Sequence, residues 1–160
     1  MVKVYLGLGS NVGDRAETIR AAFAELSAFL VDARLSRLWC SRALYIEDQP
    51  DFINAAAGGD CELSPRQLLA AINTIEQTFG RDRHRERKKG PRSLDIDILL
   101  YGSLILTEPE LIIPHTGLKE RQFALFPLLD LDPGLRDPVS GEPYKAINEA
   151  LPRQGIYLLE

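Results

Sequence analysis

Apolar residues recur every three or four positions over residues 14–30 and 64–80, and this spacing predicts two helices. The second segment also carries the signals that mark the two ends of a helix. Ser64 and Gln67 fit a capping box at its start, and Gly80 stops it. The buried stripe of this helix is predicted to consist of Leu68, Leu69, Ile72, Ile75 and Phe79, with Glu76 at its margin.

Four other segments have the composition of β-strands: residues 2–8, 35–45, 53–63 and 93–101. Within residues 53–63 small and apolar residues occupy every second position, which places Asn54 on the opposite face of the strand. Together with the two helices, these strands follow the order β-α-β-β-α-β. That order predicts an α+β fold of the ferredoxin-like type, an antiparallel sheet with helices packed on it.

The rest of the chain predicts a C-terminal extension. A short strand or turn covers residues 104–106, and a third helix begins near residue 118 and is broken near Pro127. A short helix over residues 144–151 and a last strand over 156–159 follow a segment rich in turns. With 160 residues in all, the chain is expected to form one domain over its whole length, 1–160.

The composition is that of an ordinary globular protein, with 45% hydrophobic and 26% charged residues. No apolar run reaches the roughly 20 residues that cross a bilayer, and the N-terminus lacks the features of a signal peptide. Cys40 and Cys61 are too far apart for a metal knuckle and are expected to be free thiols. These observations predict a cytoplasmic protein that does not bind membranes.

The distribution of charge says more than its sum. A net charge of −4 argues against general affinity for nucleic acids. Residues 81–92, however, contain seven Lys or Arg and two acidic residues, a local charge of +5 that leaves −9 for the rest. A charge run of this kind is most often a solvated loop. Its position directly before a pair of carboxylates favours phosphate binding by its arginines instead.

The pair of carboxylates is Asp95 and Asp97, on the predicted strand 93–101. Side chains alternate along a strand, so both carboxylates face one way, about 7 Å apart at the backbone. The opposite face is predicted to carry Leu94, Ile96, Ile98 and Leu100. Two close carboxylates repel each other unless a cation lies between them. Hard oxygen ligands of this kind suit Mg²⁺ that substrate phosphates also hold, so the pair and the basic arm together describe a nucleotide triphosphate site.

A glycine-rich stretch over residues 7–13 has a superficial similarity to a dinucleotide-binding fingerprint. Its spacing is G-x-G-x-x-x-G, and no parallel βαβ unit with a suitably placed acid follows it. A tight turn from strand to helix is the simpler interpretation.

Five short motifs occur in the order and with the spacing of one enzyme family. They are Gly9-Ser10-Asn11, Gln49-Pro50-Asp51-Phe52-Ile53-Asn54, Gly90-Pro91-Arg92-Ser93-Leu94-Asp95-Ile96-Asp97, Pro114-His115 and Arg121-Gln122-Phe123. Together they closely resemble the 6-hydroxymethyl-7,8-dihydropterin pyrophosphokinases of folate biosynthesis. The block that ends in Asp97 is the most specific of the five.

The resemblance implies that a pyrophosphoryl group moves from ATP to the hydroxymethyl oxygen of 6-hydroxymethyl-7,8-dihydropterin, with release of AMP. Asp95 and Asp97 would bind two Mg²⁺ ions that the phosphates bridge, and Arg83 and Arg92 would join them in catalysis. The residues that match ATP contacts of the family are Glu76, Arg81, Arg83, Arg92, His115 and Arg121.

The resemblance also implies a flat pocket for the pterin. Phe123 would stack on the ring, Phe52 would form a wall, and the amide of Asn54 would read the polar edge of the heterocycle. Ser41 and Leu44 match positions of the first substrate loop. Lys89 stands where many members have Trp. ATP and the pterin are then the only expected partners of a monomer that binds neither nucleic acid nor membrane.

Simpler interpretations exist for several of these residues when they are taken singly. Asp95 and Asp97 fit a solvated strand face, His115 a structural histidine, Phe123 the core, and Asn54 a local hydrogen bond. Two other functions share the main features. Another Asp-x-Asp nucleotidyl or glycosyl transferase is one, and a nucleotidyl transferase would release pyrophosphate in place of AMP. A non-catalytic RNA-binding module of ferredoxin-like fold is the other, but the two carboxylates would repel its phosphate backbone.

Overall fold

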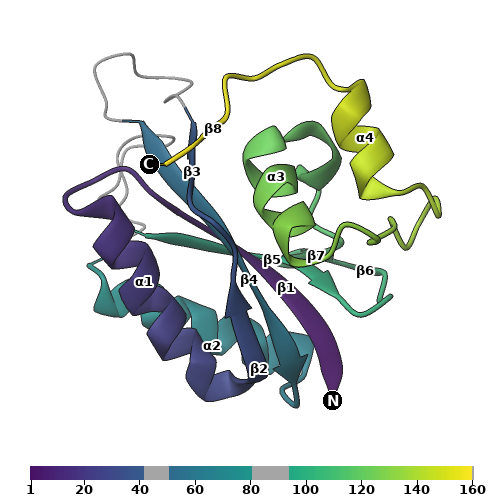
Figure 1. Cartoon of the computed structure of the whole chain (residues 1–160). Helices are drawn as coiled ribbons and strands as arrows, with labels where there is room; N and C mark the ends of the chain where they lie inside the picture. The colour runs from purple at the N-terminus through teal and green to yellow at the C-terminus, as the bar shows by residue number, and fades with distance from the viewer. Residues whose placement is uncertain (42–50, 81–93, 160) are drawn as a thin grey trace.

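The computed structural model describes residues 1–41, 51–80 and 94–159 of the chain. Within these residues an antiparallel sheet runs in the order β5-β1-β4-β3-β8, and β2 also pairs with β4 (Figure 1). Its strands are β1 Val2–Ser10, β2 Leu30–Leu35, β3 Trp39–Ser41, β4 Phe52–Cys61, β5 Asp95–Tyr101 and β8 Tyr157–Leu158. A separate hairpin consists of β6 Leu106–Glu108 and β7 Leu111–Ile113.

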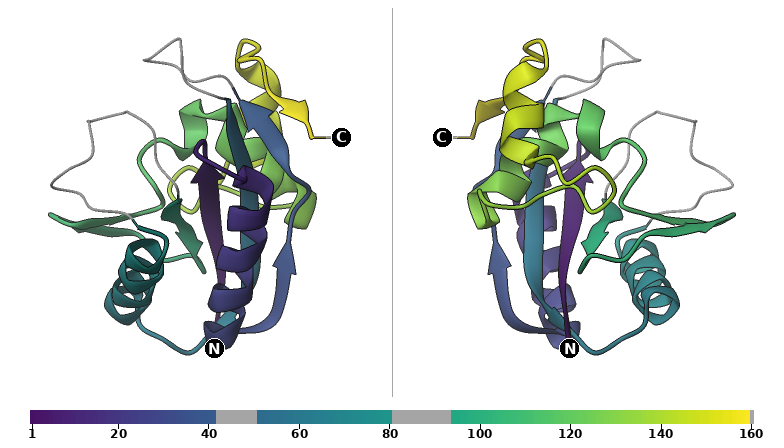
Figure 2. Two further views of the ribbon diagram at one scale, coloured as in Figure 1. Left: turned by 90° about the vertical axis from the view of Figure 1, so that its left-hand side faces the viewer. Right: turned by 90° about the vertical axis from the view of Figure 1, so that its right-hand side faces the viewer.

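Two pairs of helices lie on opposite faces of the sheet (Figures 1 and 2). Helices α1 Arg15–Leu26 and α2 Pro65–Thr78 cover one face, and α3 Gln122–Leu131 and α4 Tyr144–Ala150 pack on the other. Short 3-10 helices, η1 Ser27–Phe29 and η2 Leu118–Glu120, follow α1 and precede α3. The core is divided in the same way, since one buried cluster lies under α1 and α2 and a second, smaller one under α3 and α4. The predicted α+β, ferredoxin-like arrangement is confirmed, and its extension covers the second face.

Helix α2 begins and ends as its sequence predicts. The Ser64 hydroxyl accepts a hydrogen bond from the Gln67 N–H at 3.2 Å, and the Gln67 side chain accepts one from the Ser64 N–H at 2.9 Å. These reciprocal bonds satisfy two of the donors that a helix start leaves without partners. At the other end Gly80 has a φ of +84°, in the left-handed region that favours glycine.

The boundary between the first helix and the next strand differs from the prediction. Helix α1 ends at Leu26, and Leu30, predicted as its last residue, already pairs with Cys61 of β4. The strand predicted over residues 35–45 is replaced, as far as residue 41, by β2 and the short β3. Ser36 separates them, because its hydroxyl accepts the Ala56 N–H in place of a backbone carbonyl. A side chain that substitutes for backbone pairing leaves no signal in the apolar pattern.

Two other local predictions are wrong. Helix α3 runs through Pro127 to Leu131 and is not broken at the proline. Pro127 is buried, and Leu125 and Leu128 on either side of it are fully buried in the second cluster, so packing outweighs the one hydrogen bond that the proline cannot donate. On β5 the pairing with β1 shifts by one residue near its C-terminal end, and Leu100 therefore packs in the second cluster and not beside Ile98.

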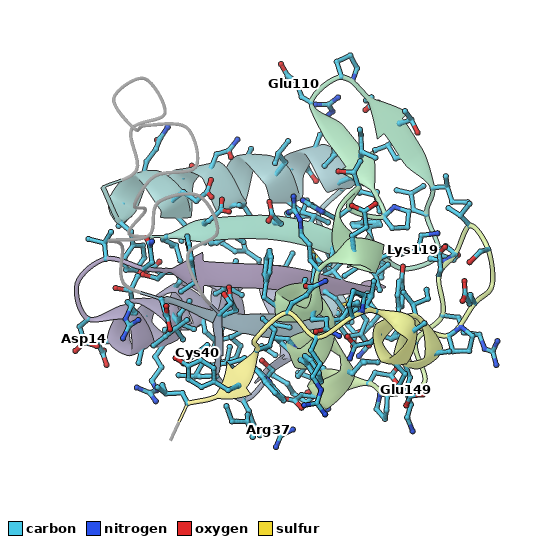
Figure 3. All side chains as sticks on the ribbon, turned by 90° about the horizontal axis from the view of Figure 1, so that it is seen from above. Asp14, Arg37, Cys40, Glu110, Lys119 and Glu149 are labelled. Carbon is cyan, nitrogen blue, oxygen red and sulfur yellow. The ribbon has the colours of Figure 1, made fainter. Side chains whose placement is uncertain are left out.

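A polar cluster fastens α3 to β3. The Asp130 carboxylate accepts hydrogen bonds from the guanidinium of Arg37, at 2.7 and 3.1 Å, and from the indole N–H of Trp39 at 3.0 Å. The Trp39 ring also stacks on Phe126 of α3, with centroids 4.8 Å apart. Figure 3 shows Arg37 on the side of the molecule away from Glu110, which lies at the turn of the β6–β7 hairpin.

In the part of the chain that the structure describes, no helix is long and apolar enough to cross a membrane.

Candidate active site

Asp95 and Asp97 project from the same face of β5, as the alternation of this strand predicts. Ile96 and Ile98 between and after them are buried in the cluster under α1 and α2, whereas the two aspartates are only partly buried. The Asp97 side chain keeps 41% of its surface exposed. The β5 carboxylates thus lie on the face away from α1 and α2, where both can reach a ligand on the sheet.

His115 approaches the carboxylates from the loop that follows β7. Its backbone N–H donates to the Leu99 carbonyl at 3.1 Å, and its Nε2 lies 3.7 Å from Asp97 Oδ1. The other ring nitrogen, Nδ1, accepts the N–H of Gly117 at 3.1 Å. Because Nδ1 is an acceptor, the neutral ring carries its proton on Nε2, the nitrogen on the side of Asp97. His115 is therefore arranged to donate a hydrogen bond on the carboxylate side of the site.

Glu76 lies deeper than its place at the margin of the α2 stripe predicts. Only 2% of its surface is exposed, and its Oε2 accepts the backbone N–H of Ile96 at 2.9 Å. A buried carboxylate needs such donors, because it loses its hydration on folding. Glu76 thereby connects α2 to β5 between the two aspartates, which fixes the backbone that carries them.

Glycines form the centre of the sheet face between the carboxylates and the predicted pterin pocket. On β1, Gly9 pairs with Asp95 on one side and with Asn54 on the other, and Gly7 pairs with Asp97 of β5 and with Ala56 of β4. A Cβ atom at Gly9 would lie 3.3 Å from the amide oxygen of Asn54. Because glycine has no side chain, nothing projects from β1 between the Asn54 amide and the two carboxylates, where a substrate would lie. The interpretation of residues 7–13 as a tight turn is therefore wrong for Gly7 and Gly9, which are paired strand residues of β1; the sequence signal for this was two glycines at alternate positions.

Ser41 and Asn54, which the sequence assigned to one pocket, are in direct contact. The Asn54 amide N–H donates to the Ser41 hydroxyl at 2.7 Å, and only 5% of the Asn54 surface is exposed. Ser41 pairs with Phe52 across the two strands, and Phe52 lies on the same face of β4 as Asn54. Since one N–H of the amide is used by Ser41, the orientation of its oxygen is fixed.

Arg121 and Phe123 lie at the start of α3. The Arg121 guanidinium carbon is 5.7 Å from the centroid of the Phe123 ring, within the range of a cation–π contact. The same side chain lies against Gly117, which donates its N–H to His115. Of the remaining predicted site residues, Leu44, Arg81, Arg83 and Arg92 lie outside the residues that the structure describes. Gly117 is a contact residue that sequence reasoning missed, because nothing in the pattern marks it.

The donor set fits a metal that substrate also holds. Among residues 1–41, 51–80 and 94–159, no three His, Cys, Asp or Glu side chains form a group that could enclose an ion by themselves. Two oxygen ligands, with the rest of the coordination shell supplied by phosphates and water, are what Mg²⁺ at nucleotide sites requires. The geometry of Asp95 and Asp97 satisfies this requirement.

The fold and the site define a class: an α+β protein whose sheet carries paired carboxylates beside a histidine, with a fixed amide two strands away, an arrangement suited to phosphoryl transfer. The comparisons with known proteins make the class specific. Residues 5–133 match the family described as 7,8-dihydro-6-hydroxymethylpterin-pyrophosphokinase. The chain belongs to this family.

Relatives of known name agree with the family. The chain is 43% identical to the 2-amino-4-hydroxy-6-hydroxymethyldihydropteridine pyrophosphokinase of Pseudomonas aeruginosa over 159 residues, which cover 96% of this chain and 94% of that protein. It is 40% identical to the folic acid synthesis protein fol1 of Schizosaccharomyces pombe over 158 residues, 96% of this chain but 21% of that longer protein.

A solved structure supports the fold. The crystal structure of Plasmodium falciparum HPPK-DHPS A437G with SDX-DHP matches at a TM-score of 0.75 and 15% identity, over 92% of this chain and 45% of that one. The family, the fold and the enzyme class predicted from the sequence are therefore confirmed. The family uses ATP as co-substrate. The roles of individual site residues stay predictions.

Proposed function

We propose that the described face of the sheet transfers a pyrophosphoryl group from ATP to the hydroxymethyl oxygen of 6-hydroxymethyl-7,8-dihydropterin and releases AMP. The observation that carries this assignment is the register Asn54–Gly9–Asp95 across three neighbouring strands. Strand spacing separates the amide from the first carboxylate by roughly 10 Å at the backbone, with a glycine between them. A bicyclic ring with a short hydroxymethyl arm fits that span, with the ring at the amide and the arm toward the carboxylates.

Asp95 and Asp97 would hold the ions of this reaction, which we take to be two Mg²⁺. Bound there, the ions supply neutralisation of the triphosphate charge and a lower pKa for the attacking hydroxyl. The protein side of this centre is the rigid spacing of the two carboxylates, which Glu76 maintains by accepting the Ile96 N–H at 2.9 Å. Because the backbone is held at Ile96, the distance between the Asp95 and Asp97 carboxylates is maintained.

The ATP side of the site comprises His115 and Arg121 among the described residues. Glu76, predicted from the resemblance to contact ATP, has 2% of its surface exposed and supports this side through its hydrogen bond from the Ile96 N–H. His115 is arranged to donate from Nε2 to a phosphate oxygen, because Gly117 occupies its Nδ1. The Arg121 guanidinium supplies a planar set of donors that matches phosphate oxygens. Arg81, Arg83 and Arg92 complete the proposed ATP contacts on the grounds of the family motif alone.

The pterin side is built from the Ser41–Asn54 pair, with Phe52 and Phe123 as aromatic walls and Leu44 as a further predicted contact. Ser41 accepts one N–H of the Asn54 amide, so that the amide oxygen and the second N–H are directed by a fixed plane. That arrangement reads one donor and one acceptor of a heterocycle edge. Stacking on the aromatic walls supplies the rest of the affinity.

In the reaction the hydroxymethyl oxygen forms a bond to the β-phosphorus, and the bond from that phosphorus to the oxygen bridging to the α-phosphate breaks. The hydroxyl proton passes to solvent water, and AMP leaves with the bridging oxygen. The chain contributes position and charge, and no covalent intermediate with the protein is required. This distinguishes the proposal from a nucleotidyl transferase, in which attack on the α-phosphorus would release pyrophosphate.

The test is an assay with ATP, Mg²⁺ and the reduced pterin alcohol in which AMP and pyrophosphate are both measured. Release of AMP in equal amount to the pyrophosphorylated pterin supports the proposal, and release of pyrophosphate would replace it with a nucleotidyl transferase. Omission of the pterin should abolish AMP release.

We also propose that the protein is monomeric, is located in the cytoplasm and does not bind nucleic acid. Sedimentation with and without RNA tests the monomeric state and the lack of nucleic-acid binding.

A further inference from the structure

The side chain of Arg121 folds back over Gly117. A Cβ atom built at Gly117 would lie 2.5 Å from Nε, 2.6 Å from Cζ and 3.0 Å from Cδ of Arg121. Carbon and nitrogen atoms without a bond between them do not approach so closely. Any side chain at residue 117 would therefore displace the guanidinium from its present position.

The backbone of Gly117 gives no other reason for a glycine. Its φ of −92° and ψ of −2° are those of the third residue of a type I turn, a conformation that most residues adopt. The need for glycine is thus a need for space beside Arg121. This separates Gly117 from Gly80, where a φ of +84° itself favours glycine.

The space beside Gly117 lies between the two substrate sides of the proposed site. The Gly117 N–H donates to His115 Nδ1, on the ATP side, at 3.1 Å. On the pterin side, the guanidinium carbon of Arg121 is 5.7 Å from the centroid of the Phe123 ring. One short segment therefore orients a histidine for the phosphates and places a cation on the aromatic residue predicted to stack on the pterin.

We propose that Gly117 is a positioning residue that keeps the Arg121 guanidinium folded onto Phe123, so that one cation serves both substrates. This inference rests on the proposed function. In the folded-back position the guanidinium restrains the Phe123 ring while it remains beside the segment that carries His115. Phosphate binding at Arg121 then also strengthens the order of the ring against which the pterin packs, and each substrate favours the other.

The test compares Gly117→Ala with Gly134→Ala, a matched control at a turn where an added Cβ would meet only the Asp132 carboxylate oxygen, at 3.3 Å. Both proteins should keep the wild-type melting temperature, because the atoms that the new methyl group at residue 117 displaces belong to the end of a flexible side chain. The Nε–H resonance of Arg121 in the free protein reports the Phe123 ring current directly. It should shift in Gly117→Ala and not in Gly134→Ala.

In the AMP assay Gly117→Ala should raise KM for ATP and for the pterin by roughly tenfold each, the size expected when one charge-assisted hydrogen bond is weakened. Gly134→Ala should leave both unchanged. In the Arg121→Ala background, Gly117→Ala should have no further effect, since the side chain that it displaces is gone.

An unchanged Arg121 resonance, unchanged KM values, or additive effects in the double variant would each overturn the inference. Failure of the proposed function looks different. If the wild-type protein releases no AMP, the kinetic arm has no signal, whereas the resonance of Arg121 still decides whether Gly117 positions its side chain.

Discussion

Where β1 and β5 carry the site, the two faces of the central sheet are built by the same strands and differ in polarity and side-chain size. Toward α1 and α2, strands β1 and β5 present Leu6, Leu8, Ile96 and Ile98, all buried. At the alternate positions the opposite face presents Gly7 and Gly9 of β1 and the two aspartates of β5. One face removes apolar surface from water, and the other keeps charged and small residues where ligands can reach them.

This contrast explains how a folded chain can carry two close carboxylates. Asp95 and Asp97 contribute little apolar burial, and the burial of Ile96 and Ile98 on the other face of the same strand stabilises it. Because the contributions come from different residues, substitutions at the site should alter turnover and those in the buried clusters should alter stability. The following predictions test that separation, and the last concerns the packing of α3 on the sheet.

The largest effect is expected at the carboxylate pair. Asp97→Ala should lower kcat for AMP release by at least about a thousand-fold, because bound metal contributes several kcal/mol to stabilisation of the transition state. Its free energy of unfolding should stay close to that of wild type, because the Asp97 side chain is 41% exposed and its loss leaves no cavity in the core. Steady-state kinetics and urea unfolding measure the two quantities. Asp60→Asn is the control, because Asp60 pairs with the surface residue Lys3 at 3.4 Å and should leave kcat unchanged.

The second effect should fall on the opposite face. Leu26→Ala, at a fully buried position of α1, should lower the free energy of unfolding by about 2–5 kcal/mol through lost burial and the cavity that remains. At a temperature well below the melting transition, kcat and both KM values should stay close to those of wild type. A loss of turnover in the folded variant would contradict the independence of the two faces.

A smaller effect is expected where the site face binds the ring of the substrate. Ser41→Ala removes the acceptor at 2.7 Å from the Asn54 amide and should raise KM for the pterin by roughly three- to tenfold, the worth of one neutral hydrogen bond. KM for ATP should not change, because the altered group lies on the far side of Gly9 from the carboxylates. Equal changes in both KM values would show that the two sides of the site are not separate.

The smallest effect concerns the anchor of α3 on the site face. Burial raises the pKa of the Asp130 carboxyl, but hydrogen bonds from Arg37 and Trp39 outweigh it and hold the pKa below its usual range. The stabilisation is therefore complete above the unfolded pKa of about 4 and is lost as pH falls through the lower folded value. In urea unfolding, the difference between wild type and Asp130→Asn should shrink as the pH is lowered from about 6 to about 2. A constant difference over that range would contradict this role.

Local patterns determined the elements whose signals lie within a few residues of one another. The capping box of α2, its end at Gly80 and the alternation of Asp95, Ile96 and Asp97 are all satisfied in the folded chain. In these places the interactions are between neighbours in the sequence, so propensity and periodicity describe them fully. The family motifs identified the site residues and the reaction. Periodicity and charge alone did not separate a pyrophosphokinase from another Asp-x-Asp transferase or from an RNA-binding module.

Contacts between distant segments decided the rest. The break between β2 and β3 depends on Ser36 and Ala56, the burial of Glu76 depends on an N–H of β5, and the path of α3 through Pro127 depends on the cluster around it. The pairing of Gly9 with both Asn54 and Asp95, and the space that Gly117 leaves for Arg121, likewise exist only after the strands are placed. A sequence specifies what each residue can offer, and tertiary structure selects the partner, because hydrogen bonds and packing act over a few ångströms of space irrespective of distance along the chain.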